Sequence, residues 1–247
     1  MHRKLTFLDH SKTGFNDEGM CGTSVVHTKG NPEPSTQHGK NIKHVTALSF
    51  VSASGEAAPP AVVATGTLHQ PDWERIWPEA TFACNPKASV TGPLWVELTA
   101  STFVKHIRQV KKIEGWVLLI IDSGGGGQGL HLSMEFTLLM YRNQIEVVAL
   151  AEYFTKALMP LDRDPHREMK LGWSALRTDF AAKTGHVVET QFQALALMRL
   201  AWLKGVSPQH VLSGWRKTGI SPWDPSEVLL RQAARVFRSQ APCTGGG

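Results

Sequence analysis

Two short apolar runs predict the interior strands of the fold. Trp116 to Ile121 is continuously apolar and ends in Asp122, and Ile145 to Leu150 is the second run. Runs of this length without alternating polar residues are typical of strands that are buried on both faces. We therefore predict two adjacent buried strands, with a carboxylate at the end of the first.

A β-hairpin is predicted upstream of these strands. His44 to Ala53 is rich in β-forming residues, Ser54 to Glu56 contains the glycine of a turn, and Ala61 to Thr65 reads as the returning strand. Lys4 to Leu8 and Val25-Val26 are weaker strand candidates. The first half of the chain thus predicts sheet rather than helix.

Helical spacing of apolar residues dominates the second half. One helix is predicted earlier, because Phe103, Ile107 and Val110 recur at helical intervals after Thr99 or Ser101, either of which could cap it. The segment Leu68 to Gly92 lacks a clear period and is expected to be irregular. In chain order the predicted helices are Thr99–Lys112, Leu132–Tyr141, Pro165–Phe180, Thr190–Lys204, Pro208–Trp215 and a basic helix Ser226–Ser239.

The order of these elements predicts a mixed α/β fold. Strands come first, strand–helix–strand follows, and helices close the chain, so a central sheet with helices on both sides is the natural packing. We expect residues 1–182 to form the core, with an irregular excursion at about 68–98. Residues 183–240 would form a helical C-terminal extension, and 241–247 a disordered tail.

Composition restricts the type of protein, its partners and its cellular location only modestly. The 247 residues are 42% hydrophobic and 19% charged, which is ordinary for a globular fold, and the net charge of +5 permits a polyanionic partner. The three cysteines are far apart, which argues against a disulfide framework and gives no metal-ligand pair. No secretory signal and no membrane span is recognisable, so we expect a soluble intracellular protein.

Three acidic positions are candidates for chemistry. Asp122 ends a buried strand, where ligands bind in open α/β sheets, although it could also cap a turn. Asp162 follows the second apolar run and precedes a helix, so it could instead be an N-cap, as could Asp164. Asp17, beside Glu18 in a glycine-flanked segment, could simply be solvated.

Carboxylates that are remote in sequence and close in space suit phosphodiester chemistry. Two Mg²⁺ ions about 3.5–4 Å apart neutralise charge on both the attacking and the leaving oxygen. Mg²⁺ prefers hard oxygen ligands, which carboxylates from different strands supply. Asp17, Asp122 and Asp162 are therefore the predicted catalytic and metal-binding set.

A glycine run after Asp122 supports a competing hypothesis. Gly124, Gly126 and Gly129 match G-x-G-x-x-G between a predicted strand and a predicted helix, which suggests a nucleotide-binding oxidoreductase. The ribose-binding acid expected about 20 residues further on is not at a strand end, since Glu146 begins its strand. No Lys-Ser/Thr pair follows the glycines, which excludes a P-loop.

Five segments of the chain stand out as motifs when they are taken together. They are Val45–Thr67 (VTALSFVSASGEAAPPAVVATGT), Leu118–Asp122 (LLIID), His131–Phe136 (HLSMEF), Leu158–Asp162 (LMPLD) and Ser213–Pro225 (SGWRKTGISPWDP). In order and spacing, over most of the chain, they resemble the motifs of the pogo-like DDE transposases, including the Tigger, Jerky and centromere protein B relatives.

This resemblance implies an RNase H-like fold and DNA as the substrate. It implies that Asp17, Asp122 and Asp162 form the acidic triad and hold two Mg²⁺ or Mn²⁺ ions for cleavage and strand transfer. A nuclear setting, no membrane association, a possible homodimer and an N-terminal helix-turn-helix region, which would lie outside this chain, are further expectations.

The sequence departs from the family pattern around each acid. The segment Phe15 to Gly19 is one residue short on each side of Asp17-Glu18, which leaves Asp9 as an alternative first acid. A longer glycine-rich segment follows Asp122, and Glu152 and Lys156 replace the usual Pro and His before Asp162. Two functions therefore stay open: a metal-dependent endonuclease, or an inactive relative that serves only as a DNA-binding or interaction domain.

Overall fold

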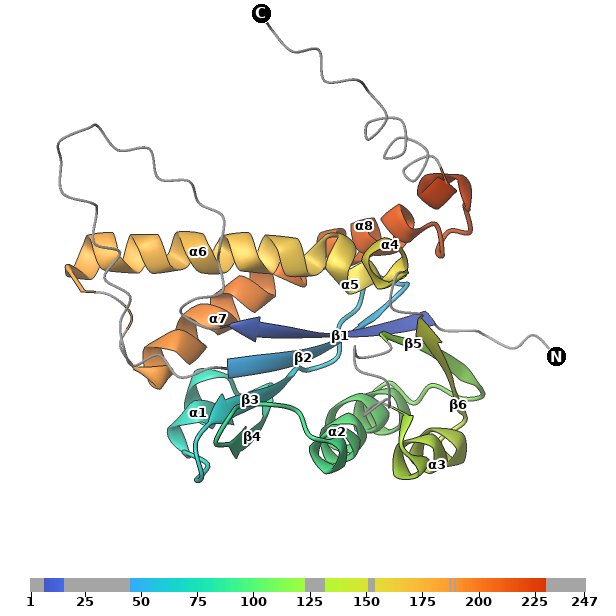
Figure 1. Ribbon diagram of the computed structural model, residues 1–247, viewed down its shortest axis with the longest axis horizontal. Helices are drawn as coiled ribbons and strands as arrows, with labels where there is room; N and C mark the ends of the chain where they lie inside the picture. The colour runs from blue at the N-terminus through green and yellow to red at the C-terminus, as the bar shows by residue number, and fades with distance from the viewer. Residues whose placement is uncertain are drawn as a thin grey trace, which may run out of the picture.

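The described residues of the computed structural model form a six-stranded mixed sheet between two layers of helices (Figure 1). These residues are 7–15, 45–122, 132–150, 154–186, 188 and 190–229, with the backbone alone at 7–15, 155 and 156. The strand order is β4-β3-β2-β1-β5-β6. The strands are β1 Phe7–Phe15, β2 Val45–Ser52, β3 Ala61–Thr65, β4 Thr81–Asn85, β5 Val117–Asp122 and β6 Ile145–Leu150.

Strand directions follow from how the chain connects them. β1, β2 and β3 are successive antiparallel neighbours, whereas β5 pairs parallel with β1, and β6 pairs parallel with β5. Parallel neighbours need crossover connections, which the helices between the later strands provide. β4 also pairs parallel, with β3, so β1 lies inside the sheet between its antiparallel neighbour β2 and its parallel neighbour β5.

The helices divide between the two faces of the sheet. In Figure 1, α6, α7 and α8 lie above it, and α2 and α3 lie below it. The helices are α1 Asp72–Ile76, α2 Gly92–Leu98, the π-helical η1 Thr99–Val104 and η2 His106–Val110, α3 Met134–Arg142, α4 Thr155–Leu158, α5 Pro160–Arg163, α6 Pro165–Thr184, α7 Gln191–Gly205 and α8 Pro208–Thr218.

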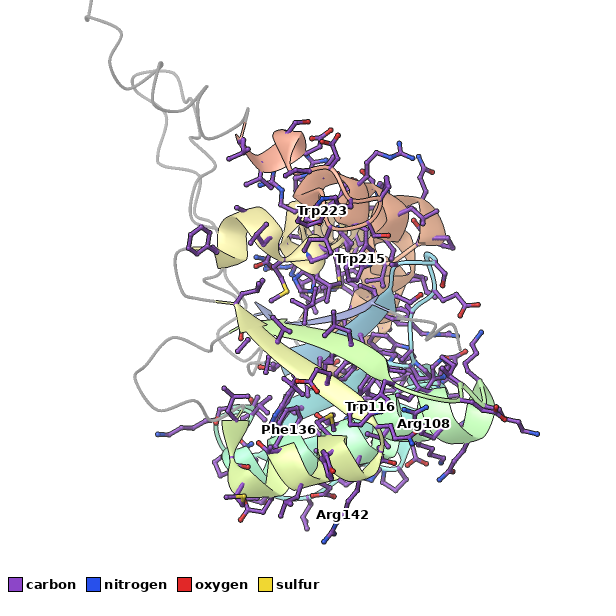
Figure 2. The ribbon with its side chains drawn as sticks, turned by 90° about the vertical axis from the view of Figure 1, so that its right-hand side faces the viewer. Arg108, Trp116, Phe136, Arg142, Trp215 and Trp223 are labelled. Atoms are coloured by element: carbon purple, nitrogen blue, oxygen red, sulfur yellow. The ribbon has the colours of Figure 1, made fainter. Side chains whose placement is uncertain are left out.

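Each face of the sheet has its own apolar core because side chains alternate along β2. Val45, Ala47 and Val51 join the upper core, which contains Trp173, Trp202 and Trp215 of α6, α7 and α8. Leu48 and Phe50 join the lower core with Trp95, Phe103 and Phe136. Figure 2 shows Trp215 and Phe136 on opposite sides of the strands.

One partly buried cation organises the lower layer. Arg108 of η2 donates from Nε to the Asn143 carbonyl (2.9 Å) and from Nη2 to the carbonyls of Gly115 (2.9 Å) and Gln144 (3.1 Å). Its Nη1 also donates to the Ile113 carbonyl. These carbonyls belong to the segments that precede β5 and β6, so Arg108 ties the starts of the two parallel strands together.

Most of the predicted elements are present, with small shifts. β3 has the predicted bounds, β2 is one residue shorter at each end, and β5 begins and ends one residue later than predicted. The three helices α6, α7 and α8 also confirm their predictions, and each ends beyond its predicted last residue. Thr190 caps α7 in a reciprocal pair with Gln193.

Four predictions about elements were wrong. β6 is the edge strand, and only Ile145 on it is buried, so it is not a strand buried on both faces. The supposedly irregular segment after Leu68 contains α1 and β4. The helix predicted from Thr99 begins at Gly92, where Pro93 occupies the first turn, so neither Thr99 nor Ser101 caps it.

The fourth correction concerns the first strand. β1 spans Phe7–Phe15 and not Lys4–Leu8, so Asp9 lies within the strand and does not follow it. The Val25-Val26 strand, residues 230–239 of the basic helix and the tail fall outside the described residues. The division into a core, an extension and a tail stays a prediction.

Candidate functional site

Asp122 stands at the carboxyl end of the parallel strands. It is the last residue of β5, is partly exposed, and pairs with Leu150, the last residue of β6. From Leu150 the chain leads through α4 to α5, which carries Asp162. The two carboxylates therefore come from elements that follow each other at one end of the sheet.

Asp162 is carried on α5, which packs over the centre of the sheet. α5 lies against β1, and its Leu161 is buried in the same core as Ile120 of β5. The side chain of Asp162 is 36% exposed, and its Oδ1 lies 3.1 Å from Nδ1 of His166. A short helix anchored by a buried leucine thus holds this carboxylate on the upper face, above the strand that neighbours β5.

The N-cap interpretation was wrong for Asp162, and for Asp164 it is right in position only. The N-cap of α5 is Met159, so Asp162 does not cap that helix, and it is not the cap of α6 either. Asp164 occupies the N-cap position of α6, but its side chain makes no capping hydrogen bond there. The carboxylate turns toward α8 instead.

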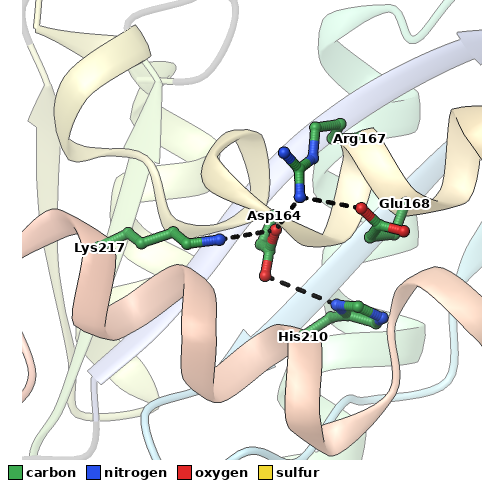
Figure 3. A network of polar contacts seen from close by, with 5 residues as sticks. All are labelled: Asp164, Arg167, Glu168, His210 and Lys217. Atoms are coloured by element: carbon green, nitrogen blue, oxygen red, sulfur yellow. Dashed lines mark hydrogen bonds and ion pairs between the residues drawn. The ribbon is translucent and has the colours of Figure 1, made fainter.

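Asp164 has a buried carboxylate, which lies at the centre of a polar network between α6 and α8 (Figure 3). Its Oδ1 lies 2.9 Å from both Arg167 Nη2 and Lys217 Nζ, and its Oδ2 lies 3.5 Å from His210 Nδ1. Burial by itself raises the pKa of Asp164. Hydrogen bonds from Ser213, Lys217 and His210, with the charge of Lys217, outweigh burial and hold the pKa below its ordinary value.

Two sequence motifs that are far apart meet on α8. Gly214 passes so close to α5 that a Cβ there would collide with the Pro160 carbonyl oxygen and lie 3.1 Å from Pro165 Cδ. Gly55, in the hairpin turn with φ +89°, faces Leu212, whose Cγ would be 2.9 Å from an added Cβ. α8 is therefore seated between the β2–β3 turn and α5, the helix that carries Asp162.

The first acid of the predicted triad cannot be compared with the other two. Asp17 lies outside the described residues, as do the glycine run and Glu152. The backbone of β1 pairs Asp9 with Ile120, two residues before Asp122 in the neighbouring strand. Both assignments of the first acid stay predictions.

The donor set fits a hard divalent cation. Asp122 and Asp162 offer carboxylate oxygens, which suit Mg²⁺ or Mn²⁺ better than softer metals. Within the described part of the chain no cluster of three or more His, Cys, Asp or Glu side chains could hold a metal ion. A complete site would therefore need a ligand from outside the described side chains.

Sequence reasoning missed His166, Ser213, His210 and Lys217. His166 follows Asp162 by only four residues, close enough in the chain for the two side chains to meet across the junction of α5 and α6. That spacing was a readable signal. The α8 residues carried no comparable signal, because their partner Asp164 is some fifty residues away in the chain and only the tertiary fold brings them together.

Comparison with known proteins places the chain in a described family. The family model for DDE superfamily endonucleases matches residues 42–215, which include Asp122 and Asp162. The Mos1 mariner paired end complex with Mn has a TM-score of 0.52 at 10% identity, covering 91% of this chain and 55% of that chain. The described fold is RNase H-like, as the sequence predicted.

Two further matches are to proteins longer than this chain. The Mos1 strand transfer complex matches with a TM-score of 0.45 at 12% identity, over 92% of this chain and 55% of that chain. The protein named MFS-type transporter clz9, from Cochliobolus lunatus, is 24% identical over 243 residues, which is 95% of this chain and 26% of that protein. The chain thus spans about a quarter of that relative. No helix among the described residues has the length and apolar character needed to cross a membrane.

Proposed function

The chain belongs to the DDE superfamily of endonucleases, and we propose that it is a transposase-derived domain that binds DNA and cuts its phosphodiester bonds with divalent metal. The observation that carries this proposal is the placement of Asp122 at the end of β5 and Asp162 on α5, which packs on the adjacent strand β1. Both residues lie inside the segment that matches the family.

The two described carboxylates have distinct supports in this proposal. Asp122 would be held by the rigid pairing of β5 with β1 and β6, and Asp162 by the packing of α5 and its contact with His166. Asp17, or Asp9, would supply the third carboxylate. When bound, two divalent ions would stabilise charge on the attacking and leaving oxygens of the phosphodiester.

DNA is the proposed partner. The net charge of +5 favours a polyanion, and the Mos1 structures similar to this chain are described as a paired end complex and a strand transfer complex. The motifs shared with pogo, Tigger and Jerky transposases support assignment to that branch. With that assignment we propose Mg²⁺ as the working metal, a nuclear location, possible dimers and a helix-turn-helix region elsewhere in the full protein.

An inactive DNA-binding relative is the second candidate function. It is favoured by the altered sequence after Asp122 and by the replacement of the usual Pro and His by Glu152 and Lys156. In that case the basic charge would still support salt-sensitive DNA binding, because counterion release depends on the cations of the protein and not on its carboxylates.

A nicking assay separates the two functions. Supercoiled plasmid would be incubated with the chain and Mg²⁺ or Mn²⁺, and the relaxed product would be quantified on gels. We expect metal-dependent nicking that Asp122→Asn and Asp162→Asn reduce to the level of a protein-free control. Asp179→Asn is the matched control, because Asp179 pairs with Lys183 on the exposed side of α6.

Binding measured in parallel completes the experiment. Fluorescence anisotropy with a labelled duplex at increasing salt would report DNA affinity independently of cleavage. Salt-sensitive binding without nicking in either metal would contradict the endonuclease and support the inactive relative. Neither binding nor nicking would contradict both candidates.

A further inference from the structure

His166 is buried directly beside the proposed metal ligand. Its side chain is 4% exposed, whereas that of Asp162 is 36% exposed, and His166 Nδ1 lies 3.1 Å from Asp162 Oδ1. The histidine thus covers one oxygen of the carboxylate from the protein side. The Asp162 side chain nevertheless keeps 36% of its surface exposed.

The contact bridges two helices and not one. Asp162 is on α5, which ends at Arg163, and His166 is in the first turn of α6, which begins at Pro165. Between them Asp164 leaves the helical path, with φ −143° and ψ −56°. The bond between His166 and Asp162 therefore fixes the direction of the carboxylate relative to the long helix α6.

Of the two ring nitrogens of His166, Nδ1 makes the contact with Asp162 and Nε2 makes none within the described residues. Within the described residues, the Nε2 atom of His166 is buried without a hydrogen-bond partner. With the proton on Nδ1, the ring donates to Asp162 and leaves only a lone pair at Nε2. An apolar side chain of similar size would fill the same space without leaving a buried polar atom unsatisfied, so packing alone does not account for histidine here.

We propose that His166 is a positioning residue for Asp162: it binds one carboxylate oxygen and so orients the other toward a divalent cation. This inference rests on the proposed metal-dependent function. Hydrogen bonds from surrounding groups orient metal ligands and typically contribute a factor of about 10–100 to metal affinity or activity. Asp164, which connects α5 to α6, is held by its ion pair with Lys217 of α8. This contact limits the freedom of His166 and Asp162 to separate.

Three substitutions separate positioning from packing. His166→Asn keeps an N–H donor near the Nδ1 position, His166→Gln moves it toward the Nε2 position, and His166→Leu keeps apolar volume without a donor. Mn²⁺ affinity of the full chain would be measured by the electron paramagnetic resonance signal of free Mn²⁺, and folding by thermal melts. The Mn²⁺ dependence of plasmid nicking would be measured on the same preparations.

We expect His166→Leu and His166→Gln to weaken Mn²⁺ binding by about tenfold or more, and His166→Asn to stay within about threefold of the wild type. The positioning role is contradicted if the His166→Leu and His166→Gln variants bind Mn²⁺ like the wild type. It is also contradicted if His166→Asn loses as much affinity as His166→Leu. In both cases the proposed function stands. If the His166→Leu variant fails to fold, the comparison of His166→Asn with His166→Gln tests the positioning role by itself. If the wild type binds no Mn²⁺, both the positioning role and the metal-dependent function fail.

Discussion

Arg108, which is partly buried, and Asp164, which is buried, are the centres of two charged clusters, one in each helical layer. Their hydrogen-bonding needs are met in opposite ways. Arg108 donates to neutral backbone carbonyls before β5 and β6, whereas Asp164 accepts from the charged side chains of Arg167 and Lys217. Burial lowers the pKa of Arg108, but a guanidinium stays protonated at neutral pH. The first cluster therefore fixes the amino ends of strands, and the second fixes the helices around Asp162.

The difference shows where stability and function are coupled in this chain. Loss of Arg108 would loosen strand starts at the opposite ends of β5 and β6 from Asp122 and Leu150. Loss of Asp164 would release α8 from α6 within two residues of a proposed metal ligand. Stability measurements and nicking measurements should consequently respond differently to the two clusters.

Arg108→Met is expected to cause the largest loss of stability. It leaves several backbone carbonyls without their donor, so we expect the free energy of unfolding to fall by about 3 kcal/mol in urea titrations. Arg142→Met is the matched control, since Arg142 lies exposed in the last turn of α3 (Figure 2), and it should change little. Equal effects of the two substitutions would show that the carbonyl cluster does not stabilise the lower layer.

Asp164→Asn is expected to cost about 2 kcal/mol at neutral pH, because it removes the charge that pairs with Lys217 and Arg167 in a buried position. The folded-state pKa of Asp164 is lowered, so its contribution is present above the unfolded pKa of about 3.9 and is lost as pH falls through the folded pKa. Urea titrations should show a constant gap to the wild type from about pH 8 to 5, and a shrinking gap below about pH 4.

Arg108→Met provides the contrast for that pH series. Its stability loss should be the same at pH 5 and pH 8, because the guanidinium is protonated throughout. A gap for Asp164→Asn that stays constant down to pH 3 would contradict the charged role of Asp164.

Gly55→Ala tests whether the hairpin turn seats α8. Gly55 and Gly185 both have positive φ, of +89° and +72°, but an added Cβ at Gly55 meets Leu212, and at Gly185 it meets nothing within 4 Å. Both substitutions place an alanine in an unfavourable backbone conformation, and only Gly55→Ala also introduces a clash. We expect thermal melts to show Gly55→Ala less stable than Gly185→Ala by about 1 kcal/mol. Equal losses would mean that Leu212 simply moves aside.

Lys111→Met should have the smallest effect. Lys111 Nζ lies 2.9 Å from Glu56 Oε1, but the two side chains are 39% and 58% exposed. Exposed ion pairs contribute about 0.5 kcal/mol and are screened by salt. Urea titrations at low and at high salt should therefore show a small gap that disappears in the high-salt buffer, unlike the gap for Asp164→Asn.

Local patterns predicted the elements well where a full period of the pattern was available. The strand β2 and the helices α6, α7 and α8 are long enough to show their apolar spacing. β3 has only five residues and was found because a glycine turn precedes it, whereas α1 and β4, also of five residues each, have no such signal and were missed. β6 reads as apolar but is largely exposed, because no other described strand pairs with its outer side, and no local pattern reports strand order.

The candidate site was predictable in the same uneven way. The strand-end position made Asp122 a candidate, and motif resemblance made Asp162 one, because each lies beside a recognisable local element. Asp164 was expected to be at most an N-cap, since the residues that surround it on α8 are distant in sequence.

By itself the sequence determined the family, the kinds of element and the two carboxylates that follow the parallel strands. These depend on motifs and on spacings of two to four residues, which are local properties of the chain. Only the tertiary structure decided that β1 lies between β2 and β5, that α8 packs on the hairpin turn, and that His166 covers Asp162. Strand order and buried polar partners depend on which apolar faces close over one another, and that is a property of the whole fold.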